Sequence, residues 1–183
     1  REAFWTHRFG LGFDEIRRGD LILVDFDLRP LEEEIEINPT MHIHAQIYRT
    51  RPDVGAIAHT HGANLVALSA TAAEFLPCSQ MAGIFLDDIR FFDEEDLIAL
   101  RPEQGAGMAG IIGQLSVLVL RNHGSLVVGP TMEDVVLRTL ALEEAAEVQL
   151  KAMSLGEARP MGRRSAEQVK SFVLTVRLGT LSI

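Results

Sequence analysis

Cysteines and basic residues are scarce in this sequence, and both shortages exclude classes of protein. Cys78 is the one cysteine among 183 residues, so a disulfide scaffold and a thiolate-rich structural zinc site are both excluded. A single thiol also fits a reducing cytoplasm, where we expect the protein to work. Lysines and arginines number 17 against 26 acidic residues, a net charge of −9. This balance argues against nucleic acid or an anionic membrane surface as a partner.

Long apolar runs and internal repeats are also lacking. No apolar stretch of the sequence reaches the roughly 20 residues that a membrane-spanning helix needs. The hydrophobic content of 47% and the charged content of 23% are typical of globular proteins. A chain of 183 residues can bury a substantial core, so we expect a single domain over residues 1–183.

Two histidines close a short apolar segment, VGAIAHTHG, at residues 54–62. Its small and apolar residues, set between Pro52 and Gly62, predict a mostly buried strand. Side chains alternate along a strand, so His59 and His61 point to the same side. The pair can either ligate a metal or form a hydrogen-bonded pair without one, and this motif alone leaves both alternatives open.

A third histidine stands at the end of another predicted strand. Residues 116–122, SVLVLRN, form an apolar, β-branched run that ends in His123 and Gly124. Three neutral imidazoles with open coordination positions are typical of a catalytic metal site. The sequence therefore predicts that His59, His61 and His123 bind one metal ion.

The segments RPDVGAIAHTHG and LRNHGSLVVG, in this order, resemble the class II aldolase/adducin family from about Thr6 to about Gly156. The resemblance implies an α/β fold of three layers, α/β/α, with a central, largely antiparallel sheet. It also implies a divalent metal, with zinc as the first choice and manganese, cobalt or iron as alternatives. A homo-oligomer, specifically a tetramer with active sites between subunits, is implied as well. The family has a helix and a strand ahead of this point, so we expect an N-terminal segment to be missing.

A helix start at Asn38-Pro39 provides the second group of candidate residues. In the aldolases of the family this start carries a catalytic glutamate and, four residues later, a histidine, which align with Thr40 and His44. These two share a helix face, and we assign them as the catalytic pair. His42 diverges from His44 by about 200° and is predicted to be a surface or interface residue. Thr40 departs from the family's glutamate in one important respect: its hydroxyl cannot hold and release a proton near neutral pH as a tuned carboxylate can.

The loop Thr6-His7-Arg8-Phe9-Gly10 replaces the small-residue phosphate loop of the family aldolases. Arg8 is suited to pairing with a carboxylate. We therefore predict that His7, Arg8 and Asn38 contact the substrate, the alternative being that the loop is simply exposed.

Together these features predict a metal-dependent lyase acting on a small hydroxy-carbonyl or carboxylate substrate. It would cleave a carbon–carbon bond, by decarboxylation or retro-aldol reaction, through a metal-stabilised enolate. Three alternatives stay open: a sugar-phosphate aldolase or epimerase of the same family, a non-enzymatic adducin-like interaction module, and a redox iron enzyme. Neither nucleic acid nor a membrane is expected as a partner.

The remaining elements follow from periodicity and punctuation. The long helix that Thr131 caps is expected to carry a wide apolar face that includes Val136, Leu137, Leu140, Ala145 and Val148, and residues 93–97 are expected to be an acidic surface segment. Strands are predicted over residues 2–6, 21–26, 83–89 and, as an edge strand or turn, 31–37; helices are predicted over 38–51, 62–73, 102–115, 131–156 and 165–178.

Overall fold

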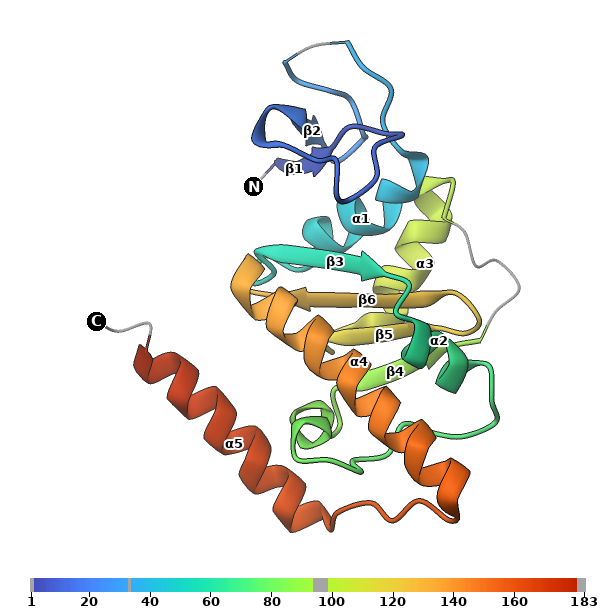
Figure 1. Cartoon of the computed structure of the whole chain (residues 1–183). Coiled ribbons are helices and arrows are strands. Elements are labelled where there is room, and N and C mark those ends of the chain that lie inside the picture. The colour runs from blue at the N-terminus through green and yellow to red at the C-terminus, as the bar shows by residue number, and fades with distance from the viewer. Residues whose placement is uncertain (1, 33, 94–98, 181–183) are drawn as a thin grey trace. The chain divides into compact units, whose positions relative to one another are not determined.

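The computed structural model describes residues 2–32, 34–93 and 99–180 (Figure 1). The chain divides into two compact units, which we describe separately. Unit 1 comprises Arg1–Gly55 and Glu94–Gln114, and unit 2 comprises Ala56–Asp93 and Leu115–Ile183. The expectation of a single domain stays a prediction.

Unit 1 combines a two-stranded sheet with two helices. The antiparallel strands pair with Phe4 opposite Val24, and their inner residues form a small core with Met41 and Ala45. The ring centroid of Tyr48 lies 5.2 Å from that of Phe4. The elements are β1 (Ala3–His7), η1 (Arg18–Asp20), β2 (Leu21–Asp25), η2 (Pro39–Met41), α1 (His42–Thr50) and α3 (Pro102–Ile112).

The predicted helix start at Asn38 is confirmed. The Asn38 side chain accepts a hydrogen bond from the Thr40 backbone N–H at 3.0 Å, so it caps the first turn, which is the 3-10 turn η2. α1 then packs closely against α3, because a Cβ on Gly105 would lie 2.6 Å from the carbonyl oxygen of His42. Glycine at this position allows the two helices to approach each other.

Unit 2 is built on a four-stranded sheet in the order β3-β6-β5-β4. β6 is antiparallel to both β3 and β5, whereas β4 is parallel to β5. The sheet is therefore mixed, with two antiparallel pairs and one parallel pair, so the expectation of a largely antiparallel sheet is confirmed only in part. The three-layer arrangement stays a prediction. The elements are β3 (Ala56–Thr60), α2 (Ala63–Ser69), η3 (Met81–Phe85), β4 (Ile89–Phe92), β5 (Val117–Leu120), β6 (Gly124–Gly129), α4 (Met132–Leu155) and α5 (Arg163–Thr180).

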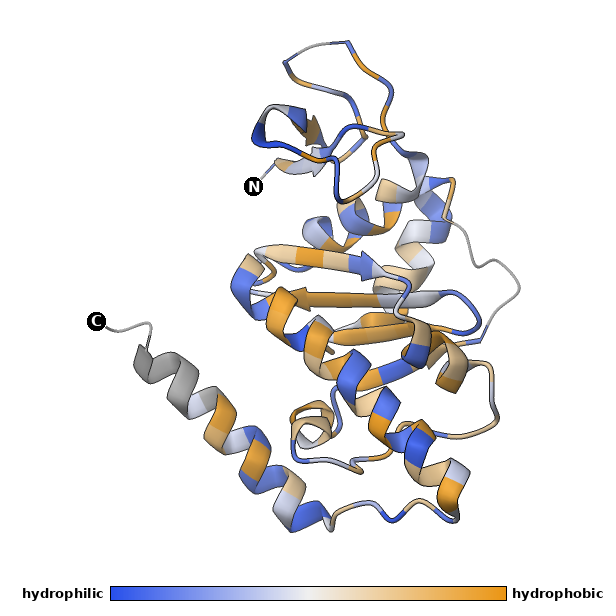
Figure 2. Ribbon diagram, viewed as in Figure 1, coloured by the Kyte–Doolittle hydropathy of each residue, from blue (hydrophilic) through white to orange (hydrophobic). Residues whose placement is uncertain are grey.

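Helix α4 crosses one face of this sheet (Figure 1). Val117, Val119 and Val127 from the strands join Leu142 of α4 in one buried apolar cluster. The strands of this sheet are mostly apolar, whereas α4 and α5 alternate between polar and apolar residues (Figure 2). The histidine motifs thus lie at the ends of strands that belong to a close-packed apolar core.

Two predicted strands are not found. Residues 83–89 form the end of η3 and a tight turn, with Asp87 at a positive φ of 54°, before β4 begins at Ile89. A Cβ on Gly83 would lie 3.2 Å from Val169 of α5, so this segment packs against a helix instead of pairing with a strand. Among the described residues of 31–37 no strand forms; the extended pairing is limited to an isolated bridge between Val24 and Pro30.

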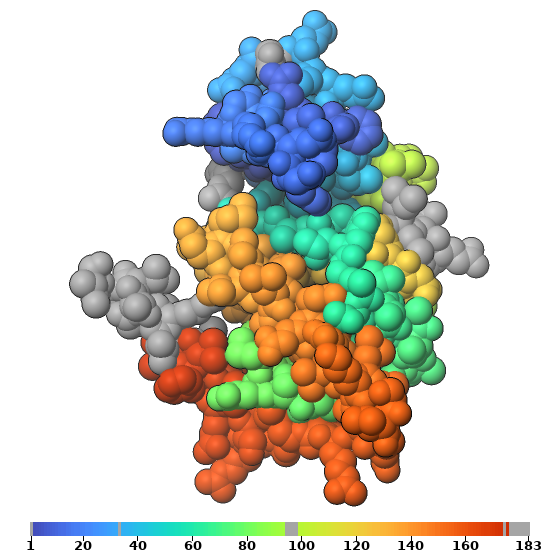
Figure 3. Space-filling view, in the orientation of Figure 1, coloured from blue at the N-terminus to red at the C-terminus, as the bar shows by residue number. Residues whose placement is uncertain are grey.

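The predicted apolar face of α4 is buried only in part: Ala145 is fully buried. Val135, Leu142 and Ala146 are buried, whereas Val136, Leu137 and Leu140 are 47%, 55% and 64% exposed. The α4 residues are visible on the surface of unit 2 in Figure 3. The predicted acidic segment lies, apart from Asp93, outside the described residues. Within the described part of the chain, no helix is both long and apolar enough to cross a membrane.

Candidate metal centre

Strand register brings the three predicted histidines together. β3 pairs with β6 so that His59 lies opposite Leu126, and His61 follows just beyond the last paired residue. His123 lies in the turn between β5 and β6, where its backbone N–H donates to Leu120 O at 3.1 Å. A Cβ on Gly124 would collide with the Thr60 carbonyl and lie 2.7 Å from the His61 ring, so only glycine fits at this position.

The three imidazole rings form a compact cluster. Their centroids are 4.8–4.9 Å apart in each pair, and one nitrogen from each ring lies within 4.8 Å of the others. The Nε2 atoms of His59 and His61 are 3.2 Å apart. Two nitrogen ligands of a tetrahedral zinc ion, each about 2.0–2.1 Å from the metal, are roughly 3.3–3.4 Å apart. The separation of the His59 and His61 nitrogens would also suit a hydrogen bond between the two rings. A metal ion would need a third ligand in addition, and the His123 imidazole lies at the same point.

The environment of His59 favours the form that binds a metal. Its Nδ1 lies 3.0 Å from the Ser125 carbonyl oxygen; a carbonyl only accepts, so Nδ1 carries the proton and Nε2 keeps its lone pair. The pKa of His59 is lowered from 6.5 to about 4, mainly by burial and also by the neighbouring His123 and His61, against the opposing effect of the Ser125 hydrogen bond. The ring is therefore neutral at pH 7.

Comparison with known proteins agrees with this geometry. Residues 1–150 match the family described as Class II Aldolase and Adducin N-terminal domain. The chain belongs to this family. A solved structure of L-fuculose 1-phosphate aldolase from Glaciozyma antarctica PI12 is 28% identical to this class II aldolase family member, with a TM-score of 0.82, and the match covers 93% of this chain and 67% of that one.

Two curated relatives of this class II aldolase family member come from Streptomyces. The 4-hydroxy-3-prenylphenylpyruvate oxygenase/4-hydroxy-3-prenylbenzoate synthase of S. roseochromogenus subsp. oscitans is 31% identical over 179 residues, covering 94% of this chain and 65% of that protein. Decarboxylase NovR of S. niveus is 32% identical over 158 residues, covering 85% and 58%. This chain thus spans about three-fifths of the length of these relatives.

The other predicted site residues lie in unit 1. The Thr40 hydroxyl donates to Asn38 Oδ1 at 2.8 Å, so both side chains are used in the start of the helix. His44 lies on α1, half-buried. The His7 ring nitrogen Nδ1 is 2.9 Å from Arg8 O. The catalytic and substrate-binding roles assigned to these five residues stay predictions. His42 is also half-buried, and burial lowers its pKa.

The sequence did not point to Ser125 or Glu143. Ser125 acts through its backbone carbonyl, which any residue would supply, although its position directly after the NHG motif was a usable signal. Glu143 accepts backbone hydrogen bonds at the start of α2, directly after His61. One glutamate in a helix rich in acidic residues carries no distinguishing sequence signal.

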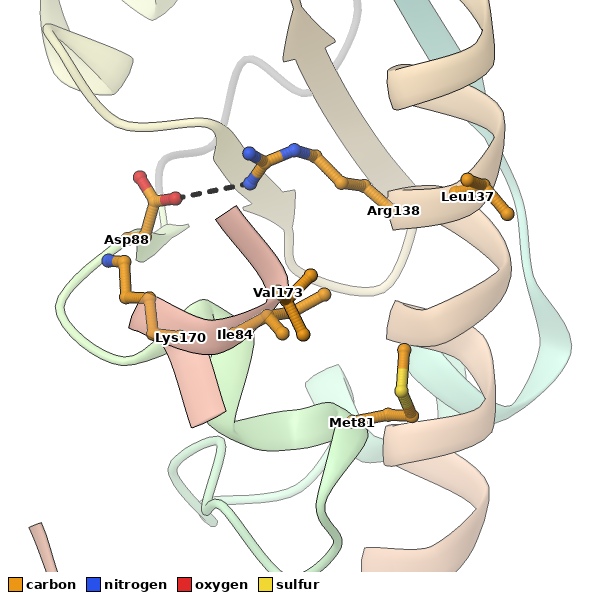
Figure 4. Close-up of a pocket in the computed structure, with 7 residues that line it drawn as sticks. All are labelled: Met81, Ile84, Asp88, Leu137, Arg138, Lys170 and Val173. Atoms are coloured by element: carbon orange, nitrogen blue, oxygen red, sulfur yellow. Dashed lines mark hydrogen bonds and ion pairs between the residues drawn. The ribbon is translucent and has the colours of Figure 1, made fainter. Parts of the chain in front are cut away.

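A separate pocket of about 150 Å³ lies beside α4 and α5 (Figure 4). Its charged groups are already paired: Arg138 lies 3.4 Å from Asp88 and 2.7 Å from Asp134, and Lys170 donates to Leu86 O. Its lining residues do not include the histidine cluster, so we do not place it in the functional site. They are Met81, Ile84, Asp88, Leu137, Arg138, Lys170 and Val173.

Proposed function

We propose that this chain is the metal-binding catalytic part of a lyase that cleaves a carbon–carbon bond of a small hydroxy-carbonyl or carboxylate substrate. The observation that carries the proposal is the convergence of His59, His61 and His123, with two Nε2 atoms 3.2 Å apart. Neutral imidazoles from strand ends suit a divalent metal that keeps open positions for a substrate. The names of the relatives, which include a decarboxylase and aldolases, support this class of reaction.

The three histidines would hold the ion, with zinc as the first choice and manganese, cobalt or iron as alternatives. When bound, such an ion supplies Lewis-acid stabilisation of the negative charge that develops on the substrate as the bond breaks. Ser125 holds the His59 ring in one tautomer, so the ring presents the same nitrogen throughout.

Decarboxylation is the variant that the chain's own residues favour. At the position of the aldolase glutamate stands Thr40, whose hydroxyl is already bonded to Asn38 and does not titrate near neutral pH. Decarboxylation releases CO₂ without a proton having to be removed first, so it tolerates the loss of that base. We assign any proton delivery to His44, because histidine is the side chain that most often serves as a general acid or base.

We further propose that Arg8 binds a substrate carboxylate, since its guanidinium can form two parallel hydrogen bonds to it. His7 and Asn38 would assist. The Asn38 carboxamide oxygen accepts twice from Thr40, so its NH₂ group would face the substrate. The name of one relative, which contains a prenylphenylpyruvate and a prenylbenzoate, supports an aromatic carboxylic acid as the substrate class.

An assay of CO₂ release tests this function. The purified protein, loaded with Zn²⁺, Mn²⁺, Co²⁺ or Fe²⁺ under anaerobic conditions, is offered an aromatic 3-oxo acid, whose loss of CO₂ leaves an enolate, together with an aromatic 2-hydroxy acid and fuculose 1-phosphate. We expect CO₂ release from a carboxylic acid that depends on the metal. Efficient cleavage of the sugar phosphate with no CO₂ from any acid would instead favour the sugar-phosphate aldolase alternative.

A redox iron enzyme is the second candidate, and the word oxygenase in one relative's name favours it. Imidazole ligands suit iron as well as zinc. Oxygen uptake measured beside CO₂ release separates the two. A lyase releases CO₂ anaerobically, whereas an oxygenase consumes O₂ in proportion to product and is inactive with zinc.

The chain is also proposed to form a homo-oligomer, as the family resemblance implies. Met132, Val136 and Leu140, on successive turns of α4, are all exposed, and large exposed apolar side chains in one row favour burial by a partner. Light scattering at micromolar concentration tests the state; a monomer would contradict the tetramer.

A further inference from the structure

The start of helix α2 directly follows the first histidine motif but lacks a cap of its own. Gly62 is the N-cap residue and makes no side-chain hydrogen bond. A helix start leaves several backbone N–H groups without partners. The residues that satisfy them therefore also determine the position of the chain just after His61.

Glu143 of α4 satisfies these groups. Its Oε1 accepts from Asn64 N at 2.8 Å, and its Oε2 accepts from Leu65 N at 3.0 Å. A carboxylate at this end of a helix also interacts favourably with the helix dipole. A Cβ on Gly62 would collide with the Glu143 carboxylate, so the glycine allows the close contact.

The other end of α2 is bonded to the turn that carries the third histidine. Arg121 donates from Nη1 to Ser69 O at 3.0 Å and Thr71 O at 3.1 Å. The backbone N–H of Asn122 donates to Ser69 Oγ at 3.0 Å, and Ser69 is 1% exposed. His123 follows immediately. α2 thus links the segment after His61 to the segment before His123.

We infer that Glu143 is a positioning residue for the metal centre, acting through α2 on His61. His59 has its own anchor in Ser125 and lies within β3, but His61 lies beyond the strand and is exposed. The Glu143 contacts to Asn64 and Leu65 fix the chain that leaves His61. This inference rests on the proposed metal centre. It adds Glu143, which lies outside the histidine motifs, as a residue on which that centre depends.

The test uses Glu143→Gln, with Glu144→Gln as the matched control. The neighbouring Glu144 is exposed on the same helix, so both variants lose one negative charge from α4. A glutamine accepts with its oxygen but presents an NH₂ group to the second N–H. We expect Glu143→Gln to weaken Co²⁺ affinity by about 10–100-fold, the range for outer-shell partners of metal ligands. The visible absorption of bound Co²⁺ should change as well, whereas Glu144→Gln should match the wild type in both.

A second variant keeps the test decisive if Glu143→Gln folds poorly. Ser69→Ala removes one hydroxyl at the opposite end of α2 and leaves Asn122 N without that acceptor, so it should also weaken Co²⁺ binding. The inference would be overturned if both variants kept wild-type Co²⁺ affinity and an unchanged spectrum, whether or not their thermal unfolding temperature fell. The proposed metal centre would not be affected by that result. A wild-type protein that fails to bind Co²⁺ would instead overturn the proposed metal centre, and the inference with it.

Discussion

The candidate residues of unit 2 and those of unit 1 are held in different ways. In unit 2, the backbone carbonyl of Ser125 bonds one nitrogen of His59 and leaves the other directed at His61. In unit 1, Thr40 and Asn38 bond to each other at the start of η2. The first arrangement leaves a ring nitrogen available to a ligand, whereas the second uses polar groups to stabilise a helix start. The proposed metal centre is thus built on the sheet, whereas Thr40 and Asn38, whose catalytic and substrate-binding roles stay predictions, also have a structural role.

Loss of one metal ligand should have the largest effect. His123→Ala is expected to weaken metal binding by more than the roughly 100-fold upper range for outer-shell partners, with loss of any activity. His42→Ala, which removes a half-buried histidine of unit 1, is the control and should retain the metal. Metal content after gel filtration measures both. Full metal content in His123→Ala would contradict the proposal that the histidines of unit 2 bind the metal.

Substrate discrimination should be the next largest effect. Phosphorylated aldols such as fuculose 1-phosphate should turn over about 10²–10⁴-fold more slowly than a carboxylate substrate, the typical cost of a missing acid/base group. Thr40→Glu, which places a carboxylate in η2, should narrow this gap. The ratio of kcat/KM values for the two substrates is the measurement. A fast sugar-phosphate reaction in the wild type would show that another group transfers the proton.

The packing of α1 against α3 can be tested with two neighbouring glycines. Gly105→Ala places a methyl group against the His42 carbonyl, so the free energy of unfolding should fall by about 1–3 kcal/mol. Gly107→Ala meets nothing within 4 Å and should raise it by roughly 0.4–1 kcal/mol. Urea unfolding compares the two. Equal effects would mean that α1 is not held by this close contact.

Acid should lower the free energy of unfolding of the metal-free protein, because of His59. Its pKa is about 4 when folded and 6.5 ordinarily, so between these values the unfolded chain binds a proton that the folded chain does not. The free energy of unfolding should therefore fall as the pH drops from 6.5 to 4, by about 2 kcal/mol. His59→Gln should lose that part of the slope. Parallel pH profiles of the two proteins would show that His59 is not buried neutral.

Local patterns were sufficient to predict the histidine cluster but not all of the fold. The HTH and NHG motifs end apolar runs, and the period of a strand alone puts His59 and His61 on one side. The failure at residues 83–89 has a physical cause: apolar residues there pack on α5 as a 3-10 turn, which no periodicity distinguishes from a buried strand.

Which part of the apolar face of α4 is buried could not be predicted for a related reason. This helix has apolar residues on most sides, so its sequence does not show which side faces the sheet. Contacts with residues distant in the sequence, such as the ion pair between Arg138 and Asp88, are needed to define that side. Glu143 shows the same limit, since its partners Asn64 and Leu65 are far away in the sequence.

X-ray absorption on the zinc-loaded protein tests the central claim most directly. If His59, His61 and His123 share one ion, the spectrum should show one zinc per chain with nitrogen neighbours at about 2.0–2.1 Å and the multiple-scattering pattern of three imidazoles. Zinc surrounded only by oxygen atoms, or less than one tightly bound ion per chain, would contradict the claim.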